Sequence, residues 1–225
     1  MKVDERMNYP TTLVKEVKQR MNNRPVEGFV AGQGSLKPKI MFVGEAPGKN
    51  EVENHIPFSG QAGKELMACL EGLKLTRADV YITSAVRSRP YRVVERINKR
   101  THEKEIVYPN RTPTKAEVFA HAPILDYEIA KIKPDLIATL GNIGLQRLLG
   151  KDHTVSKNHG QLYVGPVLEL NKQKTHYEWS KKTYRIVPLF HPAAIFYNRS
   201  LAPLIKQDWE ILDTLINDTR KGSSE

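Results

Sequence analysis

Residues 40–48 read Ile-Met-Phe-Val-Gly-Glu-Ala-Pro-Gly, an apolar run that passes directly into a loop of glycine and proline. A short run of consecutive apolar residues is typical of a strand that is covered on both faces. Three similar runs follow, at residues 80–82, 136–140 and 186–190, and segments with helical periodicity separate them. This alternation predicts an α/β fold in which helices cover a parallel sheet of four strands.

The helical segments carry local start and stop signals. Ser59 is expected to cap the helix after the first strand, because its hydroxyl can accept a hydrogen bond from a free backbone N–H. Thr114 and Glu117 have the spacing of a capping box, and Pro123 is expected to kink or split the helix that they open. Ser200 is expected to open the last helix.

Length and composition limit the class of protein. The chain has 225 residues, of which 40% are hydrophobic, so we expect one domain over residues 1–225, with a loose tail over residues 219–225. No stretch has the length of a membrane span or the apolar run of a secretory signal. We therefore expect a cytoplasmic monomer without a membrane partner. The single cysteine, Cys69, excludes a disulfide framework and a site built from several thiolates.

Basic residues predominate. Lysine and arginine number 35 against 25 aspartates and glutamates, which gives a formal charge of +10. Such a field attracts polyanions and favours a nucleic-acid partner. Basic side chains are concentrated between Arg87 and Arg111, where apolar core positions are almost absent, and we interpret residues 87–112 as a basic arm. Residues 171–182 lie between two β-like stretches, 162–170 and 184–190, which predicts a hairpin with an exposed tip.

Two of the predicted strands end in side chains that can do chemistry. Glu45 follows the first strand and His191 follows the fourth, and ligands bind at the carboxyl ends of strands in open parallel sheets. Gly44 and Gly48 allow a ligand to approach the backbone closely, and Glu51 can turn toward the same pocket. The alternative is a plain turn with solvated acids.

Five segments, taken in order, resemble the uracil-DNA glycosylase superfamily, and within it family 4. They are residues 44–48 (GEAPG), 56–60 (IPFSG), 80–83 (VYIT), 87–90 (RSRP) and 191–194 (HPAA). The resemblance spans most of the chain, from Ile40 to Trp209. It implies a three-layer α/β/α sandwich around a central four-stranded parallel sheet. It also implies a base-excision-repair enzyme that flips out a deaminated base, first of all uracil, and hydrolyses its N-glycosidic bond to leave an abasic site.

The resemblance also implies roles for single residues. Glu45 and Glu51 match the family's two acidic positions, and His191 would contact the pyrimidine O2. The base and the attacking water would be held by Gly44, Ala46, Pro47, Gly48, Phe58 and Ser84, with Phe58 stacked on the base. DNA contacts are expected from Arg87, Arg89 and Arg92 of the basic arm, and from Pro192, Ala193, Ala194, Ile195 and Tyr197.

The chemistry explains these residue types. Breaking the bond builds positive charge on the deoxyribose and negative charge on the departing base, so a donor near O2 and an acid near the sugar are wanted. His191 and Glu45 fit these two positions. The base must also be rotated out of the DNA helix. Stacking on the base and contacts with the phosphates would offset the free-energy cost of this rotation. No lysine is clearly placed as a Schiff-base nucleophile, which predicts a monofunctional enzyme.

The sequence departs from family 4 at its metal cluster. Members usually carry four cysteines for a [4Fe–4S] cluster. Here Ser88 and His121 occupy two of the expected positions, and the N-terminal pair is absent. We expect no metal and no cofactor: hydrogen bonding and packing would hold the arm, and stability would be indifferent to chelators.

Two further departures concern the base. Ser84 stands where the family usually places an asparagine, and a hydroxyl offers fewer hydrogen bonds than an amide. Weaker uracil excision, a preference shifted to hypoxanthine or a modified pyrimidine, and binding without turnover therefore remain open. Gly48 leaves space beside the pyrimidine C5, where some relatives place a tyrosine. Glu51 is expected to exclude the thymine methyl group instead, because a charge is poorly solvated against it.

Two other functions remain as alternatives. The first is a catalytically weak DNA-binding member of the same fold, which would serve as a recognition or replication-associated module. The second is an enzyme of small phosphates or nucleotides that uses residues 44–48 as an anion nest. Pro47 weakens this second alternative because it lacks a backbone N–H donor.

Overall fold

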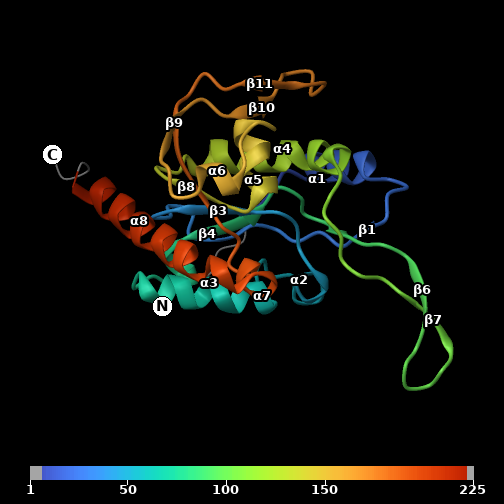
Figure 1. Cartoon of the computed structure of the whole chain (residues 1–225). Coiled ribbons are helices and arrows are strands. Elements are labelled where there is room, and N and C mark those ends of the chain that lie inside the picture. Colours follow the sequence, from blue (N-terminus) through green and yellow to red (C-terminus); the bar gives the residue numbers. More distant parts are fainter. Residues whose placement is uncertain (1–6, 222–225) are drawn as a thin grey trace.

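The computed structural model describes residues 7–221 and is built around one mixed sheet (Figure 1). The sheet has six strands in the order β2-β4-β3-β8-β12-β9. Its four inner strands are parallel to one another, whereas both edge strands run antiparallel. The strands are β2 (Gln33–Gly34), β3 (Met41–Gly44), β4 (Tyr81–Ser84), β8 (Ile137–Leu140), β9 (Tyr163–Gly165) and β12 (Tyr184–Leu189). The four predicted parallel strands are confirmed, and two short edge strands widen the sheet.

Helices cover both faces of this sheet, as Figure 1 shows. On one face lie α1 (Thr11–Arg20), α4 (Lys115–Ile132), α5 (Asn142–Leu149) and α6 (Val155–Asn158). On the other lie α2 (Lys49–Asn54), α3 (Gln61–Gly72), α7 (Ala194–Tyr197) and α8 (Ala202–Lys221). All residues of β3, β4 and β8 are buried between these layers, which explains their continuous apolar runs. The three-layer α/β/α sandwich is confirmed.

Two helix starts and one expected helix break differ from the prediction. Gly60, not Ser59, directly precedes α3. The capping box of Thr114 and Glu117 opens α4 as predicted, but α4 continues unbroken through Pro123, because packing on the sheet along its length offsets the lost backbone bond. The last helix begins at Ala202, after a 3-10 turn in which the Asn198 side chain accepts the Ser200 N–H.

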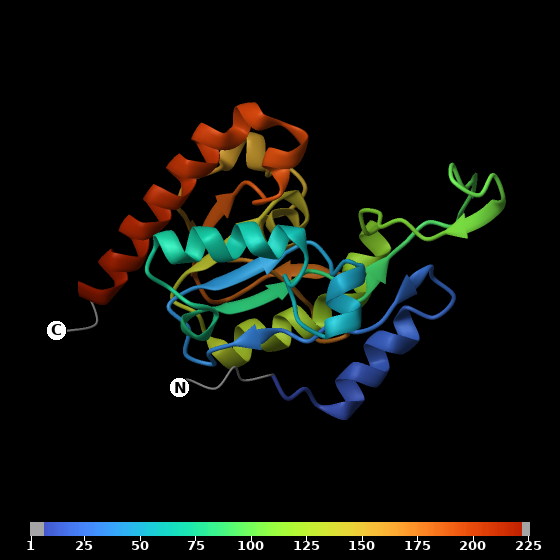
Figure 2. The ribbon, with the colours of Figure 1, turned by 90° about the horizontal axis from the view of Figure 1, so that it is seen from below.

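The segment interpreted as a basic arm divides into two parts. Residues 94–107 form a hairpin of β6 (Val94–Ile97) and β7 (Lys104–Val107), which stands clear of the body (Figure 2). Arg87 and Arg89, by contrast, lie inside the body with 1% and 5% of their surfaces exposed. The expected contacts of these two arginines with DNA phosphates are therefore wrong. Arg92 is exposed, as predicted.

Ion pairs with carboxylates hold the two arginines in place, the one in the core by a buried carboxylate and the other by an exposed one. Arg87 is ion-paired with Glu128 of α4, and Arg89 with Glu27. Glu27 belongs to β1 (Val26–Glu27), which pairs with β5 (Arg89–Pro90). The charges at these positions hold elements together and are not presented to a polyanion.

Two peripheral predictions remain. The predicted flanking stretches pair as β9 with β12, and between them β10 (Leu168–Leu170) and β11 (Tyr177–Trp179) form a further hairpin with an exposed tip. The tail expected over residues 219–225 is helical up to Lys221, where α8 ends, and residues 222–225 lie outside the described part. No helix within residues 7–221 is long and apolar enough to cross a membrane.

Candidate active site

The ends of β3 and β12 bring distant residues together. The Phe58 ring stacks on the His191 imidazole, with 5.7 Å between the ring centroids and 26° between the planes. Gly44 lies against the same ring: a Cβ atom there would come within 2.7 Å of Phe58. Only β8 separates β3 from β12 in the sheet. The end of the first predicted strand, the stacking aromatic and the histidine therefore share one site, and Glu45 directly follows Gly44.

The loop that carries Glu45 is fixed by backbone hydrogen bonds. Ala85 and Val86 donate their N–H groups to the carbonyls of Gly44 and Glu45, at 2.9 and 3.0 Å. These bonds extend the pairing of β3 and β4 beyond the strand ends. Burial raises the pKa of the Glu45 carboxyl above its usual range, and a hydrogen bond from Thr112 partly opposes this shift. A carboxyl group with a perturbed pKa at a strand end is the type of group that sites use for charge control.

Glu51 is held by two backbone amides. One of its oxygens accepts the Gly48 N–H at 3.1 Å and the other accepts the Gly60 N–H at 2.9 Å. The carboxylate thus joins the loop before α2 to the residue before α3. Its charge also acts on the imidazole, because it raises the pKa of His191 against the effect of burial. Glu51 therefore positions the glycine loop, and its expected role against thymine stays a prediction.

The proton of His191 can be assigned from one contact. The Ala193 N–H donates to His191 Nδ1 at 3.2 Å, so this nitrogen is the acceptor and the proton of the neutral ring lies on Nε2. Burial lowers the pKa of His191, with Glu51 as the weaker, opposing influence. The imidazole is thereby kept neutral, with an N–H donor on Nε2.

Ser84 is buried, and its hydroxyl proton is already engaged. The Oγ atom donates to the Val86 carbonyl at 2.9 Å, and the Arg87 guanidinium donates to the Ser84 carbonyl. At the expected base-reading position, the side chain can therefore offer only lone pairs to a base.

Asn110 is a site residue that sequence reasoning missed. A Cβ atom on Gly48 would lie 3.1 Å from Asn110 Nδ2, so this amide stands beside the glycine loop. Its oxygen accepts a hydrogen bond from Arg89 Nε at 2.5 Å, which directs the NH₂ group the other way. Asn110 was hidden within the segment interpreted as a basic arm. Its position just before the capping box of α4 was the one available signal.

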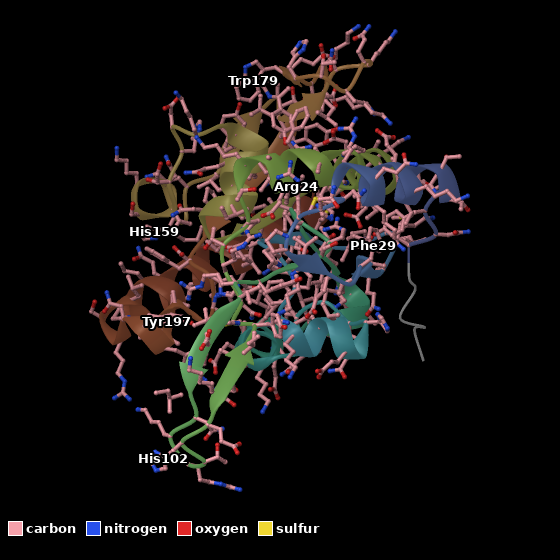
Figure 3. All side chains as sticks on the ribbon, turned by 90° about the vertical axis from the view of Figure 1, so that its right-hand side faces the viewer. Arg24, Phe29, His102, His159, Trp179 and Tyr197 are labelled. Carbon is pink, nitrogen blue, oxygen red and sulfur yellow. The ribbon has the colours of Figure 1, made fainter. Side chains whose placement is uncertain are left out.

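The remaining predicted residues lie around this centre. Ala46 and Pro47 continue the glycine loop, and Pro192 is buried directly behind His191. Ala193 and α7 follow, with Ala194 and Ile195 half-buried and Tyr197 92% exposed. Figure 3 shows Tyr197 at the edge of the molecule. Phe196, which is also exposed, lies beside it in the chain.

The residues present do not fit a cluster held by four thiolates. Ser88 Oγ lies 3.3 Å from His121 Nε2, and both side chains are buried. The second ring nitrogen of His121 is engaged with the Glu117 carbonyl, and burial lowers the pKa of this imidazole to about 4. Cys69, the single cysteine of the chain, belongs to α3. Ser88 and His121 occupy two positions where cluster ligands were expected. Their hydrogen bond joins the beginning of segment 87–112 to α4.

Comparisons with known proteins agree with this geometry. The sequence model of the Uracil DNA glycosylase superfamily matches residues 31–215. A Type-4 uracil-DNA glycosylase of Sulfurisphaera tokodaii is 33% identical over 186 residues, which are 80% of this chain and 71% of that protein. One of Archaeoglobus fulgidus is 31% identical over 191 residues, 83% of this chain and 81% of the relative.

A relative of a different kind is a DNA polymerase of Bacillus phage SP01. It is 28% identical over 202 residues, which are 88% of this chain but 17% of the polymerase. The match of the superfamily over most of the chain, together with the two glycosylases, decides the assignment. The chain belongs to the uracil-DNA glycosylase superfamily.

Proposed function

We propose that this protein is a monofunctional uracil-DNA glycosylase of base excision repair. Water attacks C1′ of a flipped deoxyuridine, uracil leaves, and an abasic site remains in the DNA. The observation that carries the proposal is the neutral His191, stacked on Phe58 beside the glycine loop, with its proton on Nε2. The names of the two glycosylase relatives support it.

His191 stabilises the leaving group. As the glycosidic bond breaks, negative charge builds on the uracil O2, and the Nε2–H donates to this oxygen. A neutral donor serves here because it need not give up its proton, and the lowered pKa keeps it neutral. One preorganised donor of this kind is worth on the order of 3 kcal/mol, a hundredfold or more in rate.

Glu45 acts on the sugar side. Its carboxylate stabilises the positive charge that develops on the deoxyribose, and Thr112 holds it through the hydrogen bond described above. Gly44 to Gly48 form the wall against which the base and the water rest. Asn110 adds an amide donor at the rim of this wall.

DNA is bound around the site. We assign the exposed Arg92 to phosphate contacts, and the segment from Ala193 to Tyr197 to the groove beside the flipped nucleotide. The formal charge of +10 favours association with the polyanion. The protein acts as a monomer, because one chain supplies both the acid and the imidazole.

A second candidate is a DNA-binding module with weak catalysis. The engaged hydroxyl of Ser84 favours it, because a base loses one donor at this position. The match to part of a DNA polymerase favours a place close to replication. Under this reading the protein would bind damaged DNA without releasing a base.

One experiment separates the two candidates. Oligonucleotides that carry uracil, hypoxanthine, xanthine or a 5-substituted uracil are incubated with the protein, and alkali-labile sites are scored. We expect cleavage at uracil, with a loss of at least about a hundredfold in Glu45→Ala and His191→Ala. Glu178→Ala and His176→Ala, in the β10–β11 hairpin, are the matched controls.

The outcomes are distinct. Binding of uracil DNA without any release supports the module. Full activity in both site variants reveals a contaminating enzyme, and borohydride trapping of a protein–DNA adduct overturns the monofunctional mechanism.

A further inference from the structure

The β6–β7 hairpin grows directly out of the wall of the site. Tyr91 forms an isolated bridge with Asn110, and the Arg92 N–H donates to the Pro109 carbonyl at 2.9 Å. The two strands thus leave the body beside the Asn110 amide. From this bridge to the turn at Lys99 and Arg100, extended strands span about 25 Å. Figures 1 and 2 show the hairpin projecting into open space.

One face of the hairpin carries four exposed apolar side chains beside an exposed ion pair between Glu95 and Lys104. Ile97 pairs with Lys104 and Glu95 with Ile106, so these four side chains share a face. Ile97 is 63% exposed and Ile106 59% exposed. The alternation of side chains places Val93 and Tyr108 on the same face, and both are exposed as well. Exposed apolar side chains gathered on one face are typical of a surface that binds something.

The charges on the hairpin favour a polyanion. Two of its three acids, Glu95 and Glu105, are paired with Lys104 and Arg96, at 3.0 and 2.7 Å, and the third, Glu103, is exposed beside the turn. Three exposed cations have no ion pair with a carboxylate within residues 7–221: Arg92 at the root, and Lys99 and Arg100 at the turn. A ribbon with cations at both ends and exposed apolar side chains between them matches phosphates that flank a groove lined by base edges.

We propose that the β6–β7 hairpin is a second DNA-binding element, which lies in the major groove of the duplex that flanks the flipped nucleotide. This inference rests on the proposed function in taking DNA as the substrate. A two-stranded ribbon fits the major groove, where thymine methyl groups accept apolar contacts. At a rise of 3.4 Å per base pair, the hairpin reaches about 7 base pairs beyond the site.

The position of α7 agrees with this arrangement. In Figure 1, α7 and the hairpin both lie in the lower part of the molecule, and in Figure 3 the labelled Tyr197 and His102 lie in the same part of the view. Tyr197 belongs to α7, and His102 to the turn of the hairpin. A duplex can therefore contact α7 near the flipped nucleotide and the hairpin further along.

The test uses the reach of the hairpin. One substrate is a single strand of about 5 nucleotides with a central uracil, too short to contact the hairpin, and the other is a duplex of about 25 base pairs. In the first variant, Asn-Gly replaces residues 97–104, which closes the hairpin at the Arg96–Glu105 pair. The second variant, Lys99→Ala with Arg100→Ala, keeps the fold of the hairpin.

We expect both variants to lose about tenfold in affinity and in kcat/KM on the duplex, while the values for the short strand stay within about twofold. The slope of log K against log salt becomes shallower by about two units in the double variant. Ile97→Ser with Ile106→Ser weakens duplex binding as well, with an unchanged salt slope. Lys172→Ala with Lys181→Ala, near the other hairpin, removes the same charge and serves as the control.

Two results overturn the inference. One is an unchanged ratio of duplex to short-strand values in both hairpin variants. The other is a wild-type dimer that dissociates in the Ile97 and Ile106 variant, which assigns the face to a second copy of the chain. Binding is measured by anisotropy on undamaged duplex as well as by excision. If the wild-type protein releases no uracil but the hairpin variants bind duplex more weakly, the proposed role of the hairpin is supported and the proposed glycosylase activity is contradicted.

Discussion

The hydroxyl of Ser84 donates its only proton to the Val86 carbonyl, although the side chain stands at the expected base-reading position. An asparagine here would add an amide donor and an acceptor, which match uracil O4 and N3–H. We predict that Ser84→Asn raises the single-turnover rate of uracil release about two- to tenfold, which corresponds to the free energy of one net hydrogen bond. The measurement is rapid-quench cleavage of a uracil oligonucleotide.

Ser84→Ala is the matched control. It removes the bond to Val86 without adding a donor, so no gain is expected. A Ser84→Asn protein that is no faster than the wild type would show that another group, such as Asn110, already serves the Watson–Crick edge.

Two residues that short motifs singled out lie together in the fold, and their expected contacts with a base stay predictions. His191 and Phe58 were named from short segments, and they stack as one pair. Arg87 and Arg89 were misplaced because their partners lie 41 and 62 residues away in the chain. A local pattern of charge does not reveal that an arginine will form an ion pair with a carboxylate far away in the chain.

At the scale of elements, the carboxylate of Glu128 links α4 to β4 through an ion pair and hydrogen bonds. Besides the ion pair with Arg87, it accepts hydrogen bonds from Tyr81 at 2.9 Å and Thr83 at 2.8 Å, and from Tyr9. We predict that Glu128→Ala lowers the free energy of unfolding by about 3–5 kcal/mol, because it leaves a buried guanidinium without its counter-charge. Urea denaturation measures the change.

The control for this prediction is a surface pair. Lys206 and Glu210 lie 3.7 Å apart on α8 and are largely exposed, so Glu210→Ala should hardly move the unfolding midpoint. If Glu128→Ala unfolded at the same urea concentration as Glu210→Ala, the network would not hold the two elements together.

At the level of elements, the apolar runs predicted the four parallel strands because each is buried on both faces. The edge strand β2 escaped notice because it has two residues and no apolar run, whereas β9 lies within the β-like stretch 162–170. Pro123 predicted a break that tertiary packing overrides. Pattern alone therefore located the sheet, while edges and helix continuity depend on contacts from elsewhere in the fold.

The stability of the whole molecule should depend on the titration of Glu45. Its pKa is raised in the folded state, so the folded protein holds this proton to a higher pH than the unfolded chain does. The corresponding stability is fully present below the ordinary carboxyl pKa and is lost as pH rises through the raised value. We predict that Glu45→Gln matches the wild type in melting temperature near about pH 4 and exceeds it near about pH 7.

Thermal unfolding at a series of pH values checks this prediction. A Glu45→Gln protein that melts below the wild type at neutral pH would mean that the folded state stabilises the carboxylate instead. The same variant should be slow in excision, so activity and stability are expected to change in opposite directions.

The order of the strands has a consequence for protein synthesis. The acid follows β3, early in the chain, but the imidazole follows β12, the last parallel strand to emerge from a ribosome. Under the proposed mechanism, a nascent chain that stops before β12 lacks the leaving-group donor and cannot cut glycosidic bonds. It also exposes the unpaired edge of β8, which invites aggregation. Under the proposed mechanism, hydrolytic competence therefore arrives only after β12 and His191 have been translated.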